Sequence, residues 1–298
     1  MNISDNIKLT FQQGSSLLRL IYINAAVFVL INIVIISMQL FRLDGSYILT
    51  YLAVPADFKQ LLFRPWTPAS YMFLHESFWH ILFNMLNLFW FGKIFLLFFS
   101  EKKLVGLYLL GGLLAALFYV AAFNIFPFYA DGLQKSILLG ASGSIMAIIV
   151  ATAVKSPNME LQLMFIGGIK LKFIAIGVVL ISAFGITSNN GGGQIAHLGG
   201  ALAGYLFVVS LQQGRDLTKG LNWMLDAINN LFRPRKLKVK PNKTRNRSTM
   251  SDADFNINKA RKMDQINQIL DKIKTSGYES LSAEEKKRLF DQGNRNNS

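Results

Sequence analysis

The chain of 298 residues contains no cysteine and only three histidines, His75, His80 and His197. Without cysteine there is no disulfide framework and no thiolate to bind a soft metal ion. Charged residues make up only 16% of the chain, well below the quarter that is usual in soluble domains. Hydrophobic residues make up 52%, and the mean hydropathy is +0.34. The composition therefore indicates an integral membrane protein.

The stretch LHESFWHILFN, at 74–84, is close to the H-E-x-x-H helix that binds zinc in metalloproteases. In that motif the two histidines are four residues apart and face one metal ion. Here His75 and His80 are five apart, so on one continuous helix their side chains would point about 140° apart. His80 and Asn84 are separated by only about 40° and share a face. We therefore expect no metal site and a His-x-x-x-Asn pair instead.

Apolar runs of nearly 20 residues recur through the first 212 positions, each about long enough to cross a ~30 Å hydrocarbon layer as a helix. Lipid offers no partner for free backbone polar groups, so the spans should be helical. We predict an all-α membrane protein with a bundle of six transmembrane helices, at 17–40, 70–98, 104–123, 142–154, 170–186 and 194–211. The fourth span is short, unless Lys155 extends to the interface or the helix continues toward Met164.

The distribution of lysine and arginine predicts the orientation, because cytoplasmic loops carry the excess. With six spans both termini lie on one side, and that side has the larger number of basic residues. The segment 1–16 and the tail 213–298 are therefore placed in the cytoplasm, with the bundle at 17–212 between them. The amino-terminal segment is polar and does not have the pattern of a removable signal peptide. Its short polar start and the lack of an organelle presequence favour a bacterial inner membrane. The connection 42–69 is predicted to lie in the outer headgroup region, anchored by Arg64 and Trp66.

The tail differs in character from the bundle, with 19 Lys or Arg against 10 Asp or Glu in 213–298. Its segment 233–247 has eight basic residues and no acidic one. Attraction to anionic lipid explains this segment better than nucleic acid, which we do not expect as a partner. Apolar residues at helical spacing in 260–273, then Gly277 and a capping box from Ser282 to Glu285, indicate a small helical hairpin. A weakly folded tail is the alternative.

Two intramembrane motifs contain residues that catalysis could use. Gly140-Ala141-Ser142-Gly143 stands where an apolar helix begins, so Ser142 lies beside backbone N–H groups that the helix leaves unpaired. Alone, this motif is better explained by tight helix packing. His197 begins another span, followed by Gly200-x-x-x-Gly204, which lets a neighbouring helix approach closely. A neutral histidine bonded to a carbonyl group is the structural alternative.

The motifs agree with one another when they are taken together. Ser142, His197 and the pair His80 and Asn84 all lie toward the outer ends of their predicted spans. A serine needs a base to become a nucleophile, and histidine is the usual base. Two side-chain donors on one helix face can then hold an oxyanion. We predict that the hydroxyl of Ser142 contacts the imidazole of His197.

The sequence resembles the rhomboid family of intramembrane serine proteases over about residues 60 to 212. The resemblance rests on four motifs in order: FRPWT, His-x-x-x-x-His-x-x-x-Asn, G-A-S-G and A-H-x-x-G-x-x-x-G. It implies a nucleophile at Ser142 and a general base at His197, in a dyad without a carboxylate. It also implies an oxyanion site formed by His80, Asn84 and the N–H of Ser142, no cofactor, and single-span membrane proteins as substrates.

Two positions depart from the family pattern. Met146 stands where the family often has an aromatic residue packed on the catalytic histidine, and Leu96 replaces an acidic residue, with Glu101 too far along to substitute. Two other functions stay open at this point. A catalytically silent rhomboid-like protein that binds membrane helices typically lacks the serine or the histidine. A small transporter would have paired repeats and charged groups at midplane.

Overall fold

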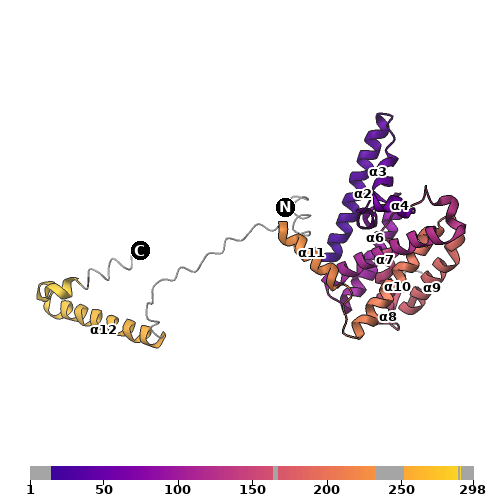
Figure 1. Ribbon diagram of the computed structural model, residues 1–298. Helices are drawn as coiled ribbons and strands as arrows, with labels where there is room; N and C mark the ends of the chain where they lie inside the picture. The colour runs from indigo at the N-terminus through magenta and orange to yellow at the C-terminus, as the bar shows by residue number, and fades with distance from the viewer. Residues whose placement is uncertain (1–14, 164–166, 233–251, 288, 290–298) are drawn as a thin grey trace. The chain divides into compact units, whose positions relative to one another are not determined.

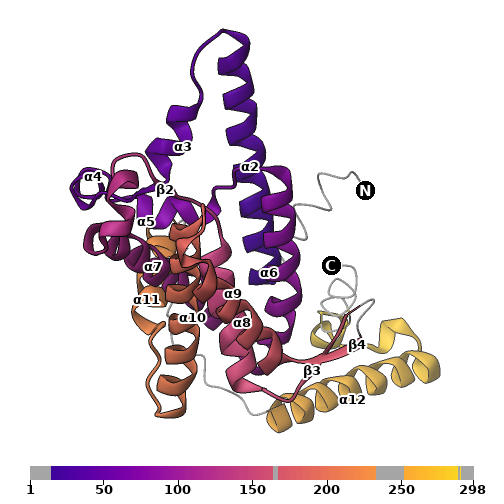
Figure 2. The ribbon, with the colours of Figure 1, turned by 90° about the vertical axis from the view of Figure 1, so that its right-hand side faces the viewer.

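The computed structural model describes residues 15–163, 167–232, 252–287 and 289. It divides into two compact units, Met1–Arg233 and Pro234–Ser298. The predicted amino-terminal segment 1–16, except for its last two residues, and the whole basic segment 233–247 lie outside the described residues. The first unit is a helical bundle, shown in Figures 1 and 2.

Within the described residues, four helices are long and apolar enough to cross a membrane. They are α2 (Ser16–Leu40), α6 (Phe78–Phe98), α7 (Glu101–Ile125) and α10 (Gly191–Gln212). Two shorter apolar helices, α8 (Ser142–Lys155) and α9 (Leu171–Phe184), occupy the positions of the predicted fourth and fifth spans. The chain is thus mostly helical with at least four candidate spans in its described part, and the count of six stays a prediction.

Successive helices of the bundle run in alternating directions. At one end the start of α2 meets the start of α7, where the N–H and hydroxyl of Ser16 donate to the carboxylate of Glu101 at 3.0 Å each. At the other end the start of α10 meets the end of α7, since Gly192 faces Tyr119 and Phe123. The starts of α6, α8 and α10 therefore share one end of the bundle, as the sequence predicted for its candidate residues.

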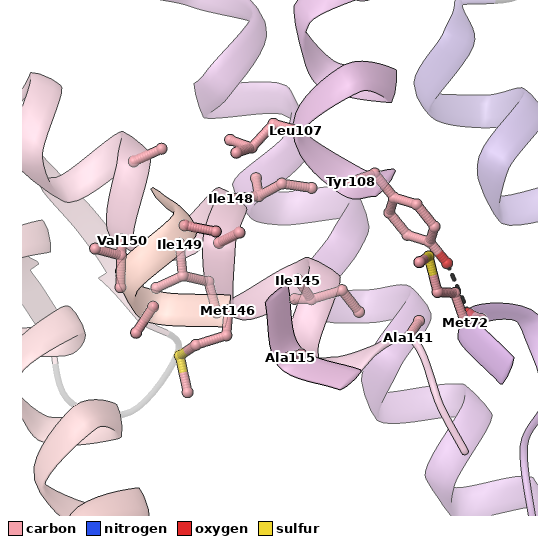
Figure 3. Packing of buried hydrophobic residues seen from close by; sticks show 14 of the residues in the cluster. Met72, Leu107, Tyr108, Ala115, Ala141, Ile145, Met146, Ile148, Ile149 and Val150 are labelled. Atoms are coloured by element: carbon pink, nitrogen blue, oxygen red, sulfur yellow. Dashed lines mark hydrogen bonds between the residues drawn. The ribbon is translucent and has the colours of Figure 1, made fainter. Parts of the chain in front are cut away.

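Helix α8 lies at the centre of the bundle and is buried along almost its whole length, from Gly143 to Ala153. Figure 3 shows its side chains Ile145, Met146, Ile148, Ile149 and Val150 packed among those of neighbouring helices. Its 14 residues span only about 21 Å at 1.5 Å per residue. A helix of this length is shorter than the about 20 residues that cross a ~30 Å layer.

The second predicted span begins later than expected, at Phe78 and not at residue 70. Residues Thr67–Ser70 form the short helix α5 and Tyr71–Phe73 a 3-10 turn, η1, after which Leu74 is extended. Ser77 then caps α6, because its hydroxyl accepts the N–H of His80. His75 therefore lies before the helix, and the angular comparison of His75 with His80 on one helix was wrong.

The segment between α8 and α9 also differs from the prediction. Helix α8 ends at Lys155, close before Pro157, which has no N–H to continue a helix. The chain then forms a hairpin of β3 (Glu160–Leu163) and β4 (Gly167–Lys170), paired antiparallel with Glu160 opposite Lys170. A continuation of the helix toward Met164 was thus wrong.

The long connection between α2 and α6 is folded on itself. It contains α3 (Ser46–Leu52), β1 (Val54–Pro55) and α4 (Phe58–Leu62) before α5. The two residues predicted to anchor it in headgroups donate hydrogen bonds to α3: Arg64 to the carbonyl of Thr50 at 3.1 Å and Trp66 to that of Tyr51 at 3.0 Å. Strand β1 pairs antiparallel with β2 (Ile137–Leu138), which leads into α8. This pairing ties the connection to the start of α8.

The first compact unit extends past the expected boundary at residue 212 to include α11 (Lys219–Phe232). The buried Thr218, just before α11, lies against Gly106 of α7, where an added Cβ would approach its side chain to 2.6 Å. An exposed ion pair joins Lys102 to Asp226 at 2.8 Å. Because exposed ion pairs contribute little, the close approach at Gly106 is the more important contact.

In its described residues the second unit contains a long helix, a turn and a further helical stretch at 283–287. Helix α12 (Asp252–Ser276) ends at Gly277, whose φ is +77°, and a 3-10 turn η4 (Tyr278–Ser280) follows. The capping box is present: the N–H of Ser282 donates to the carboxylate of Glu285 at 2.7 Å, and the N–H of Glu285 to the hydroxyl of Ser282 at 3.3 Å. The Ser282 N–H and the nearby Lys272 ammonium lower the pKa of Glu285.

Glycines allow α8 and α10 to pack backbone against backbone. A Cβ added at Gly200 would overlap the carbonyl oxygen of Gly143, and one added at Gly204 would overlap that of Ala147. The two glycines are one helical turn apart on α10, as the sequence predicted for the stripe Gly200-x-x-x-Gly204. Side chains larger than hydrogen at these positions would push the two helices apart.

We expect Gly204→Ala to lower stability by about 1–3 kcal/mol, because the added methyl group must displace α8 or α10. Gly177→Ala is the matched control, since it changes a helical glycine of α9 whose added Cβ meets no described atom within 4 Å. Thermal unfolding in detergent measures both. Equal unfolding temperatures for the two variants would contradict the proposed contribution of the α8–α10 contact to stability.

Candidate active site

The start of α8 is held in place by the segment before it. Gly140 has φ +117°, a conformation that favours glycine, and its N–H donates to the carbonyl of Tyr71 at 3.0 Å. The Tyr71 hydroxyl in turn donates to the carbonyl of Gly112 on α7 at 2.6 Å. Together with the β1–β2 pair, these bonds fix the turn that places Ser142 at the first position of α8.

The hydroxyl of Ser142 and the imidazole of His197 are in hydrogen-bond contact. The distance from Ser142 Oγ to His197 Nε2 is 2.8 Å, although 55 residues separate the two in sequence. Helix α10 carries His197 one turn before Gly200, and Gly200 is where α10 touches Gly143 of α8. The glycine contact therefore sets the separation between the serine and the histidine. Both side chains are half-buried.

His80 and Asn84 lie on α6 beside this pair. A Cβ added at Gly140 would lie 2.9 Å from His80 Nε2 and 3.9 Å from Ser142 Oγ, so the His80 ring stands over the turn that precedes the serine. Asn84 is buried, and its side-chain N–H donates to the carbonyl of His80 at 3.0 Å. The amide has a second N–H available, because each amide nitrogen carries two hydrogens.

A cavity of about 940 Å³ joins the four predicted residues, Ser142, His197, His80 and Asn84. Its walls come from α3, α6, the end of α7, the segment before α8 and the start of α10. Segments far apart in sequence line the cavity. Its polar lining residues include Ser46, Thr50, Glu76, Asn87, Ser136, Asn189 and Asn190. Its aromatic lining residues include Trp79, Phe83, Tyr119 and Phe123. The cavity is large enough to hold part of a peptide and water.

The profile of the Rhomboid domain matches residues 63–213, which is about half of the chain. The chain belongs to the rhomboid family. A second profile, a family of unknown function (DUF6576), matches residues 250–292. No curated protein matches the chain.

The rhomboid profile includes α6 to α10 and the whole cavity-forming part of α6, α8 and α10, but it leaves out α2 and the tail. Rhomboid proteins are generally intramembrane serine proteases, and the family also contains inactive homologues. The match therefore supports an integral membrane protein of this family.

The two departures from the rhomboid pattern can now be placed. Met146 is buried in the core formed around α8, as Figure 3 shows. Leu96 packs partly buried against the same core. Glu101 is occupied at the start of α7, where it accepts the two hydrogen bonds from Ser16. Glu101 therefore fastens α2 to α7 and does not replace an acid at position 96.

His75 packs its ring against that of His80, edge to face, with 5.1 Å between the ring centroids. It is buried in the turn before α6 and is not among the residues that line the cavity. Among the described residues, no three His, Cys, Asp or Glu side chains gather as a metal site would require. The ring contact indicates that His75 supports the position of the His80 ring.

Sequence reasoning missed one neighbour of the histidine, Ser182 of α9. Its hydroxyl oxygen lies 3.4 Å from His197 Nδ1. The only signal in the sequence was a single hydroxyl residue within the apolar run VVLISAF. Such a serine is common in membrane helices, where it usually bonds to its own backbone, so the sequence offered no reason to select it.

We expect Gly140→Ala to destabilise the protein by about 1–3 kcal/mol, because alanine resists a φ of +117° and its Cβ would press on the His80 ring. The ring signal of His80 should shift in NMR spectra of histidine-labelled protein, which contains only three histidines. Gly214→Ala is the control, with φ +78° and no described atom within 4 Å of the added Cβ. An unchanged His80 signal in Gly140→Ala would contradict the contact.

Proposed function

We propose that the protein is an intramembrane serine endopeptidase that hydrolyses a peptide bond in or near the transmembrane helix of other membrane proteins. The observation that supports this best is the 2.8 Å hydrogen bond between Ser142 Oγ and His197 Nε2, inside a cavity that also contains His80 and Asn84. A packing serine or a structural histidine would not need a cavity of this size beside it.

In this proposal Ser142 is the nucleophile and His197 the general base. As Ser142 Oγ attacks the carbonyl carbon of the scissile bond, Nε2 of His197 takes the hydroxyl proton. The imidazolium then gives this proton to the leaving amine, and an ester between Ser142 and the acyl part of the substrate forms. Water from the cavity hydrolyses the ester by the same proton transfers in reverse order. The scheme needs no cofactor.

Three groups are placed to stabilise the negative oxygen of the tetrahedral intermediate. They are the ring of His80, the free amide N–H of Asn84 and the backbone N–H of Ser142, which the start of α8 leaves without an intrahelical partner. Support comes from the position of the His80 ring over Gly140, two residues before the serine.

The substrates in this proposal are single-span membrane proteins. A peptide bond inside a stable helix is shielded by side chains, and its carbonyl is hydrogen-bonded. The substrate segment must therefore unwind before Ser142 can reach the carbonyl carbon. The polar groups of the cavity can accept and donate hydrogen bonds to the unwound backbone, which lipid cannot do.

We expect Ser142→Ala and His197→Ala each to abolish cleavage of a model single-span substrate in liposomes. Asn84→Ala should lower the rate about 10²- to 10³-fold, because one oxyanion donor is lost while others stay. Quantified product bands on gels measure all three. Continued cleavage by Ser142→Ala would contradict the nucleophile, and complete loss in a folded Asn84→Ala would contradict its role as one donor among several.

A fluorophosphonate probe separates a protease from a silent homologue. Wild-type protein should be labelled at one serine, and Ser142→Ala should not be labelled. A folded wild-type protein that neither reacts with the probe nor cleaves any of several substrates would instead support the silent membrane-helix-binding function.

We also propose that the protein lies in a bacterial inner membrane with both termini in the cytoplasm. Basic residues are more numerous at the end of the bundle where α2 and α7 begin, which supports an orientation with the cavity toward the outer face. The basic segment 233–247 follows α11 closely, so anionic lipid of the inner leaflet is its proposed partner.

The absence of cysteine gives a direct test of this orientation. Two variants each introduce one cysteine as a reporter. Asp131→Cys lies in the 3-10 turn η2 (Pro127–Gly132) after α7, and Lys274→Cys lies in α12. In intact cells a membrane-impermeant maleimide should label the first and not the second, and both should react after the membrane is permeabilised. Labelling of position 274 alone in intact cells would reverse the orientation.

A further inference from the structure

The ring of His197 has two nitrogens, and the proposed dyad uses only one of them. If Nε2 accepts the hydroxyl proton of Ser142, the neutral ring must carry its hydrogen on Nδ1. In serine proteases with a triad, a carboxylate holds that hydrogen and fixes the ring. No acidic side chain is hydrogen-bonded to His197 in the described part of this chain, where Nδ1 instead faces Ser182 Oγ at 3.4 Å.

The position of Ser182 on α9 distinguishes it from an incidental hydroxyl. Ser182 is 1% exposed, whereas its neighbours Ile181 and Phe184 are 69% and 82% exposed. The buried residues of α9 are Leu171, Ala175 and Ser182, which lie on one face of the helix. The helix thus turns its one inward hydroxyl toward α10, at the level of His197. The facing ring nitrogen of His197 gives this buried hydroxyl a hydrogen-bond partner.

We propose that Ser182 is a positioning residue for His197 in the proposed protease. Its hydroxyl oxygen accepts the N–H of Nδ1, which keeps the hydrogen off Nε2 and holds the ring toward Ser142. When His197 takes the proton, the ring becomes cationic, and the bond from Nδ1–H to the hydroxyl oxygen strengthens. This inference rests on the function proposed above, but the state of the His197 ring can be measured without any activity.

The hydroxyl is a weaker partner than a carboxylate because it carries no charge. Loss of one neutral hydrogen bond changes a rate by about tenfold, so a moderate effect is expected. Ser182 does not touch the substrate in this scheme, and its loss should lower kcat while leaving KM unchanged.

The variants are Ser182→Ala, which removes the acceptor, and Ser182→Thr, which keeps it. Ser144→Ala is a matched control, because it removes a buried hydroxyl from α8 that has no hydrogen-bond partner among the described residues. We expect the rate of fluorophosphonate labelling at Ser142 to fall about tenfold in Ser182→Ala, and to stay near the wild-type rate in Ser182→Thr and Ser144→Ala.

Nitrogen-15 NMR of histidine-labelled protein gives the second readout, with His197→Gln used to assign the signal. The wild-type ring should carry its hydrogen on Nδ1, and Ser182→Ala should show a mixture of the two tautomers. A ring that carries its hydrogen on Nε2 in the wild-type protein, or the same tautomer and the same labelling rate in Ser182→Ala, would overturn the proposal.

The two readouts also separate this proposal from the protease assignment. A wild-type protein that fails to react with the probe contradicts the assignment of Ser142, and the tautomer alone then decides whether Ser182 orients His197. A reactive wild-type protein with an unaffected Ser182→Ala leaves the dyad in place and removes Ser182 from it.

Discussion

The backbone contact between α8 and α10 is the constraint on which the candidate site depends. Gly200 and Gly204 let α10 lie directly on the carbonyl groups of Gly143 and Ala147. With ordinary side chains at these positions the helices would stand farther apart, and a hydroxyl on one could not reach a ring on the other. The 2.8 Å distance between Ser142 Oγ and His197 Nε2 is thus a consequence of the two glycines that follow His197 on α10, about one and two turns further along.

The short length of α8 is the second constraint. Its body is buried and apolar, and it is too short to cross a ~30 Å hydrocarbon layer. The start of a helix is also where backbone N–H groups lack intrahelical partners, and here they open into a cavity lined by polar side chains. The start of α8 therefore provides both Ser142 and a backbone N–H that can serve the proposed oxyanion site.

Sequence reasoning could predict the residues that meet, because His80, Asn84, Ser142 and His197 all lie at helix ends that alternating spans bring to one side. It could not predict where the individual helices begin and end. A capping serine at 77 removed His75 from α6, and Pro157 stopped α8 before a hairpin that no apolar periodicity signals. Ser182 was missed for a different reason: its role depends on which way α9 turns, and a single serine in an apolar run does not encode that.

The pairing of Ser142 with His197 and Ser182 suggests why such a site can exist without a carboxylate. A buried carboxylate beside His197 would stabilise the imidazolium, but it would have to lose its hydration in an apolar bundle, which is costly. A hydroxyl is less costly to bury and still fixes which nitrogen bears the hydrogen. The precise placement of the ring then has to come from helix packing, and the glycines of α10, together with α9 on its other side, supply that packing. In this fold the neutral hydroxyl of Ser182 and the backbone contact between α8 and α10 together hold the His197 ring.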